Sequence, residues 1–161
     1  MANGRLLGIY LNDHLAAAAA GEELARRSLA NNRGSELGAF LERLVGEISD
    51  DRGALERLMA GLGVAKSPWK RRAALVAERA GRLKLNGQLR GYSPLSRLLE
   101  LEGLTAAIAA KRSLWLNLRE AAKPGPQATG VDLDGLLARA EAQLAELERH
   151  RVDAAGRAFS A

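Results

Sequence analysis

The stretch GVAKSPWKRRAALVAERAGRLKLNGQLRGY, residues 63–92, decides the fold of this chain. It separates two long helix-forming segments, and Ser67-Pro68 and Asn86-Gly87 within it mark the start and the end of a shorter predicted helix. Neighbouring antiparallel helices in a bundle are usually joined by only about 2–8 residues, whereas this connection has about 30. Its length therefore predicts a crossover along the molecule instead of a tight turn.

Four long helices are expected around this crossover, because Ala, Leu, Arg and Glu dominate the rest of the chain and favour helix. The predicted segments cover residues 6–30, 35–62, 94–122 and 132–159. Each has about 25–30 residues and a length of roughly 37–45 Å. Two antiparallel hairpins joined by one long crossover form the ferritin-like version of the four-helix bundle. We therefore expect an all-α, ferritin-like four-helix bundle, with a short fifth helix in the crossover and a single domain over residues 1–161.

Composition narrows the chemistry that this domain can perform. The chain has 161 residues, of which 47% are hydrophobic, enough for one domain with its own core. It has no cysteine, which excludes disulfides, zinc–thiolate sites and thiol nucleophiles, and its two histidines leave little room for Ser-His-Asp catalysis.

Asp13 and His14 interrupt the apolar N-terminal stretch, and no apolar run approaches the roughly 18 residues of a transmembrane helix. We therefore expect a cytoplasmic protein without a membrane partner.

Charged residues interrupt the predicted apolar helix faces at a common height. Counting along the helices puts Asp13, Asp51 and Lys111 about 17–18 residues from the same end of the bundle, or roughly 26 Å in. We expect the positive charge of Lys111 to offset the negative charges of the two aspartates. His14 and Glu47 are expected to complete a hydrogen-bonded central polar layer. The preferred interpretation of this layer is a buried ion-pair network that fixes helix register. The alternative is a small-ligand or catalytic pocket built on the same residues, and no catalytic residue is assigned.

A second charged level is expected nearer the same end. Glu102 and Arg151 each lie about 9 residues in, or roughly 13 Å. At equal height they can form a charge-assisted and bidentate ion pair.

A two-metal carboxylate centre is the alternative that a four-helix bundle suggests. Such a centre takes a carboxylate from each of two helices and a Glu-x-x-His pair from each of the others. This chain has Glu47 followed by Asp50 where that pair is needed, and neither His14 nor His150 has a glutamate three residues before it. We therefore expect no metal and no other cofactor. The alternative single-metal site would use Asp13, His14, Glu47 and Asp50.

The crossover is strongly basic. Between residues 66 and 97 the chain has nine Lys and Arg residues against the single acidic residue Glu78. The candidate anion-binding side chains are Lys70, Arg71, Arg72, Arg79, Arg82 and Lys84. Because charge runs are usually solvated faces and no nucleic-acid-binding motif accompanies this one, nucleic acid is not the expected partner. Anion or nucleic-acid binding stays an alternative.

Several strings of the chain carry a resemblance to a known group of proteins. They are YLNDHLA (10–16), GEISDDR (46–52), GRLKLNGQL (81–89), YSPLSRLLELEGL (92–104) and AKRSLW (110–115). Together they resemble a group of uncharacterised bacterial proteins placed near the ferritin-like superfamily, and the resemblance covers nearly the whole chain. It implies a ferritin-like bundle and no particular activity. Since the metal-ligand pattern is not retained, iron storage and oxygenase chemistry are not implied.

Three function hypotheses follow. The first is a non-enzymatic structural or interaction protein that forms a homodimer through an exposed helix face. The second is a metal-dependent or small-ligand enzyme in the bundle core, of the di-iron or di-manganese carboxylate type. The third is an anion or nucleic-acid binder that uses the basic crossover.

Overall fold

Four helices make up the part of the chain that the computed structural model describes, residues 2–67, 91–121 and 129–160. They are α1 (Ala2–Asn32), α2 (Glu36–Gly61), α4 (Pro94–Glu120) and α5 (Leu133–Phe159). No strand is present within these ranges, which confirms the predicted all-α four-helix architecture. The short helix predicted within the crossover falls on residues outside the described ranges.

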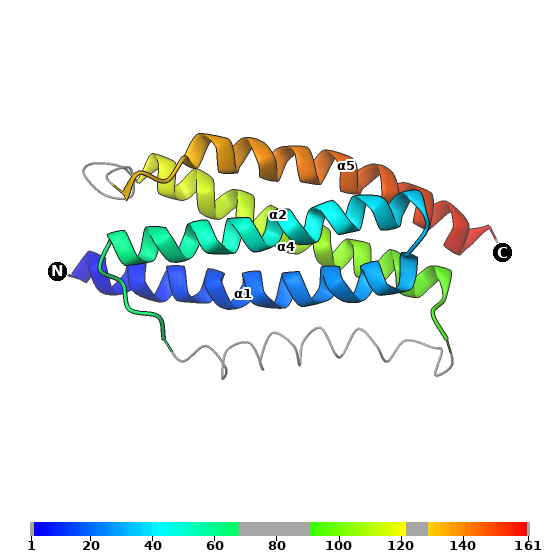
Figure 1. Cartoon of the computed structure of the whole chain (residues 1–161), viewed down its shortest axis with the longest axis horizontal. Helices are drawn as coiled ribbons and strands as arrows, with labels where there is room; N and C mark the ends of the chain where they lie inside the picture. The colour runs from blue at the N-terminus through cyan, green and yellow to red at the C-terminus, as the bar shows by residue number, and fades with distance from the viewer. Residues whose placement is uncertain (1, 68–90, 122–128, 161) are drawn as a thin grey trace.

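The helices form two antiparallel hairpins, α1 with α2 and α4 with α5 (Figure 1). Because α2 and α4 run in the same direction, the chain leaves α2 near one end of the bundle and enters α4 near the other. Helix α1 packs closely against both α2 and α4, and α4 packs against α5. In contrast, α2 and α5 approach each other closely at only a few residues. That wider separation leaves room between α2 and α5 for long polar side chains.

Local sequence signals set the starts of three helices. Ser35 caps α2, because its Oγ accepts a hydrogen bond of 3.0 Å from the backbone N–H of Gly38. Ser93 caps α4 in the same way, with Pro94 in the first turn, and Asp132 caps α5. Serine and aspartate are typical residues at this position of a helix. Helix α1 differs from the prediction because it begins at Ala2, about a turn before the first predicted helical residue.

The core is built from the inward faces of all four helices. Its largest fully buried side chains are Trp115, Leu11, Leu41, Leu44, Leu55, Leu58, Met59, Leu101, Leu104, Ile108, Leu114 and Leu118. Gly103 lies where α4 meets α1, and a Cβ there would stand 3.0 Å from the side chain of Leu24. This glycine therefore permits the close approach of the two helices. No described helix is both long and apolar enough to cross a membrane.

Candidate functional site

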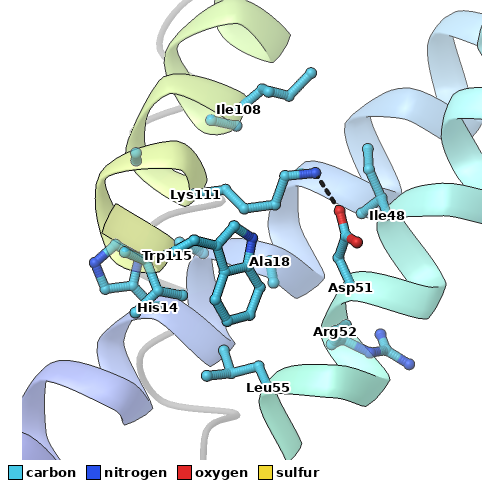
Figure 2. A pocket seen from close by; sticks show the side chains of 14 residues that line it. His14, Ala18, Ile48, Asp51, Arg52, Leu55, Ile108, Lys111 and Trp115 are labelled. Carbon is cyan, nitrogen blue, oxygen red and sulfur yellow. Dashed lines mark hydrogen bonds and ion pairs between the residues drawn. The ribbon is translucent and has the colours of Figure 1, made fainter. Parts of the chain in front are cut away.

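A buried ion pair joins α2 and α4 near the middle of the bundle. Lys111 Nζ lies 2.5 Å from Asp51 Oδ2, and the two side chains are only 13% and 2% exposed (Figure 2). Burial lowers the pKa of Lys111, and the carboxylate of Asp51 opposes that change. The pair is the part of the predicted central layer that the structure brings into direct contact.

Two residues of α5 complete this polar cluster. Arg139 Nη2 lies 2.5 Å from the second oxygen of Asp51, so each carboxylate oxygen faces a cation. Gln143 accepts a hydrogen bond of 2.6 Å from Lys111 through Oε1 and donates one of 2.7 Å to Glu47 through Nε2. We call these five residues the Asp51 layer. It contains two cations, two carboxylates and one amide, so its formal charges balance.

The Asp51 layer belongs to a longer row of contacts between α2 and α5, which we call the α2–α5 seam. Successive partners are spaced three or four residues apart on both helices, so they share one face of each. The pairs are Arg139 with Asp51, Gln143 with Glu47, Glu146 with Arg43, and His150 with Phe40. The Arg43–Glu146 ion pair measures 2.6 Å, and the His150 and Phe40 ring centroids lie 5.0 Å apart. Long side chains thus join two helices whose backbones are not closely packed.

The two α1 residues of the predicted layer differ in their relation to this cluster, because only His14 lines the same pocket as Asp51 and Lys111. Asp13 is exposed, and its side chain lies outside the Asp51 layer. His14 is half-buried, and its ring meets that of Tyr10 edge-on at a centroid distance of 4.5 Å. Burial lowers the pKa of His14, with Asp13 acting in the opposite direction. Glu47 belongs to the layer, but it reaches Lys111 only through Gln143.

The predicted contact between Glu102 and Arg151 is replaced by another pair. Arg151 makes two hydrogen bonds of 2.7 and 2.6 Å to Glu148, one turn earlier on the same helix. Glu102 is exposed and adds only a weaker charge effect on the raised pKa of Arg151. A partner three residues away on one helix needs no interhelical fit, and it is favoured for that reason.

A second buried carboxylate, which the sequence analysis does not predict, lies on α1. Glu22 is 6% exposed and lies 2.6 Å from Arg26 of its own helix and 2.8 Å from Arg52 of α2. Arg139 and Gln143 were also missed, although their spacing of four residues on one helix face is a usable signal. All three were overlooked because they lie beside, and not within, the apolar stripes of their helices.

The described carboxylate and histidine side chains are not arranged as a metal centre. Among the described residues, no three His, Asp or Glu side chains are grouped so that they could hold an ion. Asp13 and Asp50 of the single-metal alternative are exposed, while the His14 ring packs against Tyr10 and Glu47 accepts a hydrogen bond from Gln143. Both oxygens of Asp51 are already engaged by cations, which repel a metal ion. The candidate anion-binding side chains lie outside the described residues; they are Lys70, Arg71, Arg72, Arg79, Arg82 and Lys84.

A small pocket adjoins the Asp51 layer where α1, α2 and α4 meet (Figure 2). It has a volume of about 40 Å³ and a mainly apolar lining. Its walls include His14, Ala18, Gly21, Ile48, Leu55 and Trp115. Lys111 and Asp51 form the polar side of the pocket.

Comparison with protein-family models, curated proteins and solved structures found no match to this chain.

Proposed function

We propose that this chain is a non-enzymatic structural or interaction protein of the cytoplasm, built on a ferritin-like bundle in which the Asp51 layer stands in place of a metal pair. The observation that carries this proposal is the engagement of both Asp51 oxygens by cations from α4 and α5. Two cations beside one carboxylate stabilise its negative charge and repel a further cation, so they disfavour both metal binding and protonation of Asp51. Its role is therefore structural.

The Asp51 layer supplies helix register in this proposal. Buried ion pairs add little net stability, because desolvation offsets their attraction, but losing one partner costs about 3–5 kcal/mol. A shift of α4 or α5 by one turn would separate Lys111 or Arg139 from Asp51 and incur such a cost. The Leu- and Ala-rich faces of these helices would tolerate the same shift far better, since one apolar contact replaces another.

The test replaces three of the four charged members of the layer by apolar residues of similar size. In Asp51→Leu/Lys111→Met/Arg139→Met, we expect a melting temperature equal to or above that of the wild type, since the remaining charge, on Glu47, keeps Gln143 and Arg43 as partners. We also expect broadened or duplicated amide signals in ¹H–¹⁵N NMR spectra, because register is no longer fixed. The control Arg112→Met/Glu141→Leu removes an exposed 2.8 Å pair and should leave one set of signals. A single sharp set of signals in the triple variant would overturn the register role.

Metal analysis tests the enzymatic alternative. Protein purified without chelators and measured by elemental analysis should contain far less than one iron, manganese or zinc per chain. About two metals per chain would replace the structural proposal with the carboxylate-type metal centre.

A homodimer through α5 is part of the proposal, and a specific surface favours it. Val152 and Phe159 are 56% and 74% exposed and lie seven residues apart on one helix face. Between them Gly156 has open space where a Cβ would stand. Two copies of α5 crossing antiparallel near Gly156 would place Val152 of one copy beside Phe159 of the second copy. The same arrangement sets Asp153 next to Arg157 of the second copy, so the charges are complementary.

The dimer can be tested by cross-linking, because the native chain has no cysteine. We expect Gly156→Cys to form a disulfide-linked dimer under mild oxidation and Phe159→Ser to shift the protein toward the monomer in light scattering. Ala138→Cys, on an exposed position elsewhere on α5, is the matched control and should not cross-link. A monomeric mass for the wild type at high concentration would overturn the dimer while leaving the register role intact.

A further inference from the structure

The pocket beside the Asp51 layer exists because two facing helices carry small side chains. Helix α1 presents Ala17, Ala18 and Gly21, and α4 presents Ala107 and Ala110 on the opposite side. Larger side chains in these positions would fill the gap. The volume of about 40 Å³ exceeds the roughly 10–15 Å³ that one water needs and falls below the roughly 150 Å³ of a cavity that holds benzene. The pocket therefore suits a molecule of a few heavy atoms.

Trp115 lines this pocket and has a buried hydrogen-bond donor without a partner among the described residues. Its side chain is 1% exposed, and Nε1 has no hydrogen-bond partner among the described residues. Figure 2 shows the indole with its nitrogen edge turned toward the side where Lys111 meets Asp51. Buried donors are nearly always satisfied in native proteins. Because an indole N–H can only donate, whatever satisfies it must bring an acceptor atom.

The surroundings favour a neutral molecule over an ion. The charge of Lys111 is matched by Asp51, and the Asp51 layer as a whole has no net formal charge. Arg52, which also lines the pocket, is paired with Glu22 at 2.8 Å. The rest of the lining consists mostly of aliphatic side chains such as Ile48, Leu55 and Ile108. Burial lowers the pKa of His14 and so favours the uncharged imidazole at neutral pH.

We infer that this pocket binds a small neutral carbonyl compound, whose apolar body lies among the alanines and whose oxygen accepts a hydrogen bond from Trp115 Nε1. Ligand binding of this kind goes beyond the structural role proposed above and does not depend on it. The compound needs at least one acceptor and only a few carbon atoms. Short ketones, aldehydes and amides share this chemistry.

The indole proton provides a direct readout. The chain has two tryptophans, so Trp69→Phe leaves Trp115 as the source of the single indole signal in a ¹H–¹⁵N spectrum. Acetone is the probe, and isobutene, which has CH₂ in place of the oxygen, is its matched control. We expect acetone to move the signal downfield in a saturable way, with a Kd on the order of 10 mM for four heavy atoms. Isobutene should cause no downfield movement.

Filling variants separate binding in the pocket from a solvent effect. Ala18→Leu should abolish the response to acetone, whereas Ala138→Leu, on an exposed position of α5, should retain it. Gly21→Ala is a milder second variant, because its Cβ would stand 3.5 Å from the Cβ of Ala107, an ordinary contact. It should weaken binding several-fold while the protein stays folded. A linear response without saturation, equal responses in Ala18→Leu and wild type, or no response at all would overturn the inference.

Discussion

Lys111 Nζ lies 2.5 Å from Asp51 Oδ2, and this contact joins the α1–α2 hairpin to the α4–α5 hairpin inside the bundle. Both side chains are buried, and Arg139 occupies the remaining oxygen of the aspartate. Removing one member of such a buried ion-pair group destabilises a protein much more than replacing the whole group by apolar residues.

Asp51→Ala is expected to destabilise the protein by about 3–5 kcal/mol, because it leaves Lys111 and Arg139 without their shared carboxylate. Urea denaturation followed by circular dichroism measures the change. The control Glu141→Ala removes an exposed partner of Arg112 and should change stability by about 0.5 kcal/mol or less. An unchanged unfolding midpoint for Asp51→Ala would contradict a structural layer.

Gln143→Met is expected to cost about 1–3 kcal/mol, because Lys111 and Glu47 each lose a hydrogen-bond partner in a buried setting. The double variant Gln143→Met/Glu47→Met should lose less than the sum of the two single variants, since the second change removes a group already without its partner. A double-mutant cycle measures that coupling. Additive losses would show that Gln143 and Glu47 act independently.

Glu22→Gln is expected to destabilise the protein by about 1–3 kcal/mol, because Arg26 and Arg52 lose the charge of a buried carboxylate. Glu23→Gln is the matched control, since Glu23 is the exposed neighbour on the same helix and should change stability by about 0.5 kcal/mol or less. Thermal unfolding of the two variants side by side makes the comparison. Similar melting temperatures would argue against the importance of the Glu22 contacts.

His14 should give stability a pH dependence. Its pKa is lowered in the folded protein, so below the usual value of about 6.5 the unfolded chain binds a proton that the folded protein does not. Stability should therefore fall as the pH decreases from 6.5 toward the lowered pKa of the folded state, and level off below it. In His14→Gln this contribution is absent, and the difference in unfolding free energy between the two proteins should shrink as the pH falls. A difference that stays constant from pH 7.5 to 5 would contradict a lowered pKa.

The helices and their caps could be predicted because their determinants are local. Ser35, Ser93 and Asp132 each bind a backbone N–H three residues on, which spacing alone reveals. The contact between Asp51 and Lys111 could also be predicted, because counting residues gives height once the topology is assumed.

The remaining contacts depend on helix separation, helix rotation and competing partners, none of which follows from residue spacing along the sequence. Arg139 and Gln143 reach the layer because α2 and α5 are held apart, and helix separation depends on how all four helices pack. Successive residues of a helix are rotated by about 100° around its axis, so Asp13 faces solvent although its neighbours on α1 are buried or half-buried. Arg151 pairs with Glu148 on its own helix. Counting residues between helices does not take account of such a competing partner.

The uneven spacing of the helices has a consequence for motion. Along α1 and α4 the backbones are in direct contact, while across α2 and α5 the hairpins are held by flexible side chains. We therefore expect the α2–α5 edge to open more readily than the α1–α4 contact, and added salt should loosen that edge first by screening the Arg43–Glu146 pair.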